Sequence, residues 1–228
     1  SRLRSPIYNS KDSLIAAVST IDGQSNIFIG KLDLNNVSKE YFKKNSIEFI
    51  KVSNFNNLEY ISSISWGENS NILMDIIKDH GRDIYSIQVD IKNNALSNVI
   101  EVFNNKNDLR NPIVDNGLLY FSNDYNGVFN ISYQNNNNEF KFLTNVFGGA
   151  FMPDISNEKL VYSLYSDGGY KIAIINNLVS INEDSIGYVN PYEQELSYLD
   201  IRYNEKKLSN IKSYSTHMSD IHIVPRVQ

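Results

Sequence analysis

The residue in this sequence best placed to do chemistry is Asp75, which stands in the middle of the apolar run Ile72–Ile77. Such a run is buried when it folds, so its carboxylate must be paired or have its pKa raised. One interpretation is a ligand-binding or acid–base group near a channel. The other is a structural aspartate held by backbone amides or by an arginine of the neighbouring unit. The sequence leaves both open.

Other reactive groups are sparse. The chain has no cysteine and three histidines, which excludes disulfides, thiolate nucleophiles and cysteine metal sites. Asp220 and His222 alternate along one predicted strand, but the sequence nominates no further ligand beside them. It also contains no Gly-x-Ser-x-Gly elbow and no phosphate-binding glycine loop. We therefore expect no catalytic residue, no metal and no cofactor.

Length and charge narrow the possible partners. The chain has 228 residues, of which 41% are hydrophobic, and its net charge is −5. This argues against a nucleic-acid partner, because phosphate contacts need an excess of Lys and Arg. No apolar run approaches the roughly 20 residues of a membrane helix, so no membrane span is expected in this segment.

The chain begins at Ser1 without a Met and stops just after a strand-like stretch. We expect a piece of a longer protein.

Four strand-like apolar runs recur along the chain. A glycine follows nine residues after the first apolar residue of each run, and the glycines are 58, 46 and 42 residues apart. The runs cover residues 14–19, 72–77, 118–122 and 160–164, and the glycines are Gly23, Gly81, Gly127 and Gly169. Pairs such as Asp22-Gly23 and Asn126-Gly127 are typical of hairpin turns. The pattern predicts four repeated hairpins.

Further strands complete each unit. A short segment precedes each run, a second strand follows each turn, and a third follows in most units. Residues 37–45 are read as an extended hairpin loop. Four strands at a period of about 40–50 residues are typical of β-propeller blades. The runs are apolar on both faces, as expected for strands packed between neighbouring blades. We predict an all-β fold, a partial β-propeller of about four blades of four antiparallel strands.

The units resemble the WD-like repeat of TolB-type propellers. In the family's repeat, a Pro, an aromatic residue and a turn come before an apolar strand, and residues 6–12 stand in this way before Leu14. Tyr8 and Trp66 take the aromatic position, and Asp83-Ile84-Tyr85 fits the second strand. The segment Phe142-Leu143-Thr144 is similar to the Leu-Thr that closes such repeats. No unit carries an intact Ser-Pro-Asp-Gly turn, and Asn116-Gly117 comes nearest. The resemblance covers about residues 4–182.

The resemblance implies a domain organisation and a function. Residues 1–182 are expected to be TolB-like blades of an incomplete propeller, and 183–228 a degenerate last blade or a linker to a missing domain. The implied function is a non-catalytic protein- or peptide-binding module of a bacterial cell envelope or periplasm, completed by missing blades or domains of its own chain. Two alternatives remain. One is the substrate-gating or glycan-binding propeller of a hydrolase, such as a prolyl-oligopeptidase-like or tricorn-like protease. The other is the periplasmic part of an outer-membrane barrel protein.

Four aligned positions mark the start of the first strand of each unit, a place that often lines the channel or rim of a propeller. They are Arg4, Ser62, Arg110 and Phe151. Two arginines on such a ring could capture a carboxylate or phosphate of a partner. The alternative is that they form ion pairs between blades or point into solvent. With Asp75, these residues are the predicted binding site.

Overall fold

The computed structural model describes most of the first four-fifths of the chain. The described residues are 2–32, 47–55, 59–79, 81–89, 98–135 and 140–187. The predicted loop at 37–45, the three histidines and residues 188–228 lie outside this part. No helix within it is long and apolar enough to cross a membrane.

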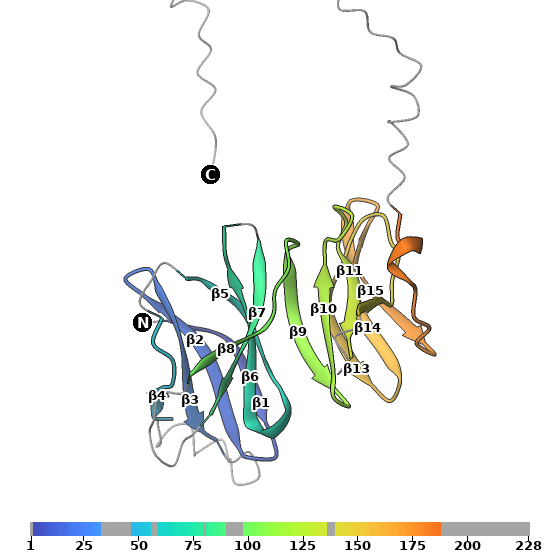
Figure 1. Ribbon diagram of the computed structural model, residues 1–228. Coiled ribbons are helices and arrows are strands. Elements are labelled where there is room, and N and C mark those ends of the chain that lie inside the picture. Colours follow the sequence, from blue (N-terminus) through green and yellow to red (C-terminus); the bar gives the residue numbers. More distant parts are fainter. Residues whose placement is uncertain are drawn as a thin grey trace, which may run out of the picture. The chain divides into compact units, whose positions relative to one another are not determined.

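The described residues form four antiparallel sheets, which we call blades 1 to 4 (Figure 1). Blade 1 contains β1 (Leu3–Asn9), β2 (Leu14–Ile21), β3 (Gln24–Lys31) and β4 (Phe49–Lys51). Blade 2 contains β5 (Ile61–Trp66), β6 (Asn71–Ile77), β7 (Arg82–Gln88) and β8 (Val99–Phe103), with the 3-10 turn η2 (Glu68–Ser70). Blade 3 contains β9 (Leu109–Asp115), β10 (Leu118–Asn123), β11 (Asn130–Gln134) and β12 (Phe140–Phe142). Blade 4 contains β13 (Ala150–Ser156), β14 (Lys159–Ser166) and β15 (Gly169–Asn176), and the 3-10 turn η3 (Glu183–Ser185) follows.

The strands of each blade pair in the order of the sequence, as the repeat predicted. The hairpin turns follow from local chemistry: Asp22 and Gly23 have φ angles of 50° and 79°, and Asp167 and Gly168 have 50° and 76°. Positive φ at both central residues suits a tight hairpin turn, and Asp-Gly adopts it readily. Blade 4 departs from the four-strand expectation, because three strands of it are described.

The hydrophobic core lies between successive blades. Ala16 and Val18 of blade 1 pack with Met74 of blade 2 in one buried cluster. Leu73 of blade 2 packs with Phe121 of blade 3 in a second. The third cluster joins blade 3 to blade 4 and includes Tyr120, Ile131, Leu160 and Tyr162. Neighbouring residues of one strand therefore enter opposite interfaces, because successive side chains point to opposite faces. This confirms the prediction of burial on both sides for the runs at 14–19, 72–77 and 118–122. The run at 160–164 buries Leu160 and Tyr162 on one face, whereas Val161 on the other face is exposed.

A repeated side-chain clamp fixes the outer strand of two blades. In blade 3, the Asn130 side-chain oxygen accepts hydrogen bonds from Thr144 Oγ1 and Val146 N, at 2.9 and 2.8 Å. Thr144 Oγ1 in turn accepts one from Ile131 N at 2.8 Å. In blade 1, Asn26 and Ser53 make the same contacts. The Thr of the Leu-Thr pattern, Thr144, thus holds the fourth strand of blade 3 against β11.

Replacing the clamp hydroxyl should destabilise the protein. In Thr144→Val, the buried Ile131 N–H loses its acceptor while the shape of the side chain is kept, so we expect a loss of about 1–2 kcal/mol. Urea unfolding followed by tryptophan fluorescence would measure it. Asn145→Ala, which removes an exposed neighbour, is the control. Equal midpoints for the two variants would show that the clamp carries no net stability.

Candidate functional site

The predicted site residues lie at one recurring feature of the fold. In every blade the pairing of the first and second strands shifts register near the start of the first strand, between Arg4 and Ile7 in blade 1 and between Phe151 and Asp154 in blade 4. Such β-bulges leave a backbone N–H without its ladder partner. The aligned residues Arg4, Ser62, Arg110 and Phe151 all occur at these bulges. We call this end of the blades the bulge rim.

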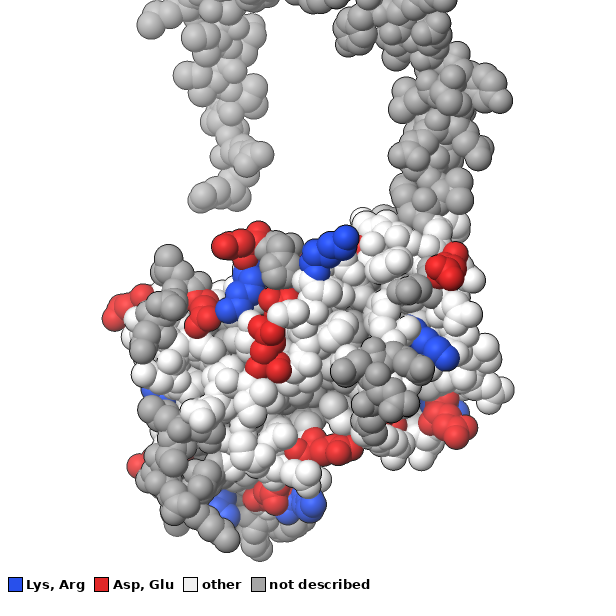
Figure 2. All heavy atoms as spheres, in the orientation of Figure 1, with Lys and Arg blue, Asp and Glu red and all other residues white. Residues whose placement is uncertain are grey.

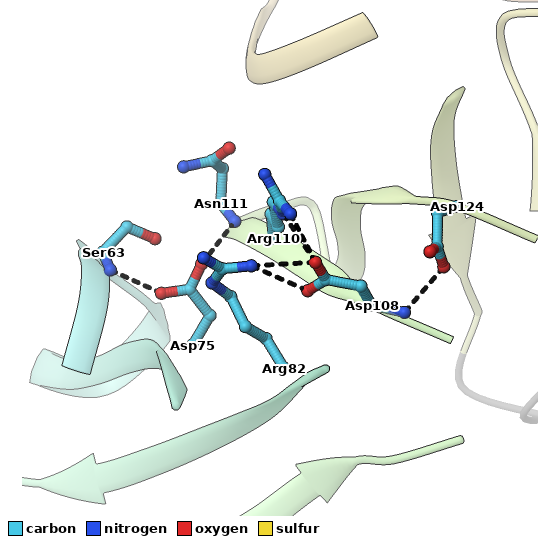
Figure 3. A network of polar contacts seen from close by, with 7 residues as sticks. All are labelled: Ser63, Asp75, Arg82, Asp108, Arg110, Asn111 and Asp124. Atoms are coloured by element: carbon cyan, nitrogen blue, oxygen red, sulfur yellow. Dashed lines mark hydrogen bonds and ion pairs between the residues drawn. The ribbon is translucent and has the colours of Figure 1, made fainter. Parts of the chain in front are cut away.

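Asp75 of β6 connects two neighbouring bulges. Its side chain is fully buried, and its two oxygens accept hydrogen bonds from Ser63 N in the same blade and from Asn111 N in blade 3, the second at 3.1 Å (Figure 3). Burial is the main effect that raises the pKa of Asp75, against the opposing effect of these hydrogen bonds and of the Arg82 charge. Asp75 therefore has the environment expected of a structural aspartate, because its buried carboxylate is held by backbone amides.

A second carboxylate ties blade 2 to blade 3. Asp108 accepts hydrogen bonds from Arg82 Nη1 on both oxygens, at 3.0 and 2.8 Å, and from Arg110 Nε at 2.9 Å. Its own backbone N–H donates to Asp124 Oδ1 at 2.6 Å. Burial alone would raise the pKa of the Asp108 carboxyl, but the hydrogen bonds from Arg110 and Arg82 outweigh it and the pKa is lowered. Figure 3 shows the Arg82 guanidinium beside both carboxylates.

Arg4 of blade 1 also connects two neighbouring blades. Arg4 donates hydrogen bonds to the carbonyl oxygens of Ser62, at 3.3 Å, and Ile61. Its guanidinium carbon lies 4.5 Å from the centroid of the Tyr60 ring. The structure therefore brings Arg4 and Ser62 together across the interface of blades 1 and 2. It does not bring Arg4 to Arg110, because each arginine contacts its own set of neighbours.

An aromatic row continues the site across blades 3 and 4. The Arg110 guanidinium lies 4.2 Å from the centroid of Phe129. Phe129 and Phe151 are 5.0 Å apart by ring centroid, Phe151 and Tyr170 6.2 Å, and Tyr170 and Tyr165 5.1 Å. Tyr170 is 70% exposed. These five residues form what we call the aromatic row, and Phe151 stands at its middle.

Both carboxylates of the site are engaged by hydrogen-bond donors. The oxygens of Asp75 accept from two backbone amides, and those of Asp108 accept from two guanidinium groups. Within the ranges that the structure describes, no three His, Cys, Asp or Glu side chains converge as metal ligands. Within the aromatic row, Tyr170 is the side chain most exposed to solvent.

Sequence reasoning missed several members of the site. It did not single out Arg82, Asp108, Asn111 or Phe129, which together supply most of the contacts just described. One signal was available: Asp108 lies two residues before the aligned Arg110 and directly before β9, so the alternation of an extended chain places both side chains on the same side. Nothing local to Arg82 indicates its pairing, because its partner lies 26 residues away.

No protein-family model matches the sequence, and no curated protein matches it either. Solved structures do match the fold. The structure of putative TolB from Agrobacterium tumefaciens is similar with a TM-score of 0.53 and 15% identity, over 76% of this chain and 62% of that one. A Mycobacterium tuberculosis puromycin-hydrolyzing peptidase gives a TM-score of 0.56 at 8% identity, over 83% of this chain and 30% of that one.

A third structure is prolyl oligopeptidase B from Galerina marginata, bound to a 35mer hydrolysis and macrocyclization substrate. Its TM-score is 0.51 at 12% identity, over 80% of this chain and 27% of that one. These similarities confirm the predicted fold: the described part of the chain is a partial TolB-like β-propeller. The chain spans less than two thirds of the length of each of these three proteins. Among the larger contacts between described strands, none joins blade 4 back to blade 1, so the described blades form an open series.

Proposed function

We propose that this chain is a non-catalytic module that binds a protein or peptide on its bulge rim. The observation that carries the proposal is the aromatic row, in which ring contacts lead from the partly buried Arg110 to the exposed Tyr170. Aromatic side chains offer a large contact area at a low entropy cost, and they dominate binding energy at protein interfaces. A row held by its own ring contacts is also preorganised, which lowers the cost of binding.

The charges of the site define the kind of partner. Arg110 is already paired with Asp108, so its guanidinium serves to support Phe129 rather than to capture a free anion. Figure 2 shows the charged side chains of the face in view as small groups of both signs, between large uncharged areas. The partner that suits this surface presents apolar or aromatic side chains, and neither nucleic acid nor an acidic surface fits it.

The binding test compares Tyr170→Ser with Ile100→Ser. Ile100 is 60% exposed on β8 of blade 2 and lies outside the row. Peptides selected from a random phage-displayed library on the native protein are titrated against both variants. We expect Tyr170→Ser to weaken binding at least about tenfold, as for an exposed aromatic hot spot, and Ile100→Ser to leave it unchanged. Equal affinity of all three proteins, or no selected peptide, would remove the proposal.

The proposed location is the bacterial cell envelope or periplasm. The support is the structural similarity to the putative TolB, together with the TolB-like repeat of the sequence. Fractionation of the source cells, with an antibody against this chain, tests the location. Recovery with the cytosolic proteins would count against it.

A second candidate is the propeller domain of a hydrolase. The similarity to two peptidases supports it, and in that case the catalytic residues would lie in a domain outside this sequence. Sequencing the gene on both sides of this segment separates the two candidates. A hydrolase domain beside the repeats would favour the gating function, and further repeats without one would favour the binding module.

A further inference from the structure

Two pockets open at the end of the blades opposite the bulge rim, and we call them the turn pockets. The bulges lie near the start of the first strands, whereas the turns that join first strands to second strands line these pockets. The first pocket lies between blades 1 and 2 and is lined by residues 8–12 and 66–70. The second lies between blades 2 and 3 and shares Gly67 and Glu68 with the first. Each has a volume of about 470 Å³, within the roughly 300–1,000 Å³ typical of small-molecule sites.

Hydrogen bonds between the turns hold the first pocket in shape. Asp12 Oδ2 accepts hydrogen bonds from Asn9 Nδ2, at 3.0 Å, and from Ser70 Oγ of blade 2. The Asn9 side-chain oxygen accepts from two backbone N–H groups of its own turn, at 3.0 and 3.3 Å. Glu68 Oε1 accepts from Gly117 N of blade 3 at 2.8 Å. Three turns are thus fixed to one another before any ligand arrives, which lowers the cost of binding.

Two aromatic residues form the apolar part of the first pocket. Tyr8 and Trp66 are both half-buried, and Trp66 also packs against the buried cluster of blades 1 and 2. The indole Nε1 of Trp66 is buried and has no hydrogen-bond partner within the described residues. An unsatisfied buried donor costs about 1–3 kcal/mol. A bound molecule that brings an acceptor oxygen to this N–H would remove that cost.

The charges of the first pocket argue against an ionic ligand. The carboxylates of Asp12 and Glu68 repel an anion. A cation gains little, because both carboxylates already accept hydrogen bonds from protein groups and Lys11 lines the same pocket. The remaining lining residues supply amide and hydroxyl groups, which donate as well as accept hydrogen bonds; they include Asn9, Ser10, Asn69 and Ser70.

We propose that the turn pockets bind a neutral saccharide, with one sugar unit beside Tyr8 and Trp66 and the next beyond Glu68 in the second pocket. Each sugar hydroxyl both donates and accepts hydrogen bonds, which matches the mixed polar groups of the lining. The C–H face of a sugar ring is apolar and packs on aromatic side chains. This is a second binding site, separate from the aromatic row of the bulge rim.

Titration with trisaccharides tests the proposal in the full chain. Trp66 is the only tryptophan of the sequence, so its fluorescence reports directly on the first pocket. Cellotriose, maltotriose and triacetylchitotriose, which are neutral and differ in linkage and substituents, are added in turn. We expect a saturable change of emission with at least one of them. In Glu68→Ala the dissociation constant should rise at least about tenfold, because a hydrogen-bonding carboxylate common to both pockets is lost.

Glu48→Ala is the matched control, because Glu48 is an exposed carboxylate directly before β4 and lines neither pocket. It should bind the saccharide as the native chain does. Trp66→Phe keeps an aromatic ring but removes the N–H donor, and isothermal titration calorimetry replaces fluorescence for this variant. We expect its affinity to fall at least about fivefold.

No saturable change with any of the three trisaccharides would overturn the proposal. Equal dissociation constants for Glu68→Ala and Glu48→Ala would also overturn it. Loss of binding to the phage-selected peptides in Glu68→Ala would assign the turn pockets to a peptide instead. Tyr170→Ser should leave saccharide binding unchanged, so the proposals for the aromatic row and for the turn pockets fail separately.

Discussion

Asp75→Ala is expected to lower the free energy of unfolding by about 2–5 kcal/mol. The fully buried carboxylate accepts the bulge N–H groups of Ser63 and Asn111. Without it, both donors remain buried with no acceptor, at about 1–3 kcal/mol each. Both amides belong to bulges, so no strand neighbour can replace the lost acceptor. Urea unfolding of the full chain measures the change through its midpoint at constant slope.

Asp154→Ala is the matched control, because Asp154 lies in β13 with its side chain exposed. It should leave the midpoint nearly unchanged. If the two variants unfold at the same urea concentration, the contacts of Asp75 carry no net stability, and its burial would then be explained by a ligand or partner.

The raised pKa of Asp75 also predicts how the stability of the protein depends on pH. Its folded-state pKa is raised above the usual value of about 3.9. The stabilising contribution of this group is thus fully present below about pH 3.9 and is lost as the pH rises through the folded-state pKa. The stability of the native chain relative to Asp75→Asn should therefore fall as the pH is raised from about 3.5 to 7. A relative rise would show that hydrogen bonding to the ionised carboxylate outweighs burial.

Asp108→Ala is expected to lower the free energy of unfolding by about 2–3 kcal/mol, the second large effect. This change leaves the guanidinium groups of Arg82 and Arg110 without their shared acceptor at the interface of blades 2 and 3. Breaking a fully buried ion pair costs about 3–5 kcal/mol. The value here is lower because these side chains retain some contact with water. Thermal and urea unfolding report the loss.

Asp167→Asn provides the comparison, since it removes the charge of an exposed pair with Lys171 and keeps a residue type that tolerates the positive φ of the turn. Exposed pairs contribute little, so this variant should unfold close to the native chain. The pH dependence has the opposite sign to that of Asp75. The pKa of Asp108 is lowered, so its contribution is present above about pH 3.9 and is lost as the pH falls through the folded-state pKa. An Asp108→Ala effect no larger than that of Asp167→Asn would mean that the ion pairs of Asp108 add no net stability to the interface of blades 2 and 3.

Much of the fold could be predicted because its signals are local. A hairpin turn at Asp22-Gly23 needs positive φ at two adjacent residues, and those two residue types supply it. The apolar runs at 72–77 and 118–122 are long enough to show that both faces of a strand are buried. These features depend on neighbours in the chain, and the repeat made them visible four times.

The roles of the site residues depended on contacts between blades. Asp75 is recognisable as unusual from its apolar neighbours, but its partners lie 12 and 36 residues away in two different bulges. Arg110 looked available for a ligand until the fold placed Asp108 and Phe129 against it. The path of the chain from β15 back to β12 likewise has no mark in the local sequence. Alternation and turn chemistry determine strands and hairpins, whereas the packing of one blade on the next decides which charges meet and which face remains open.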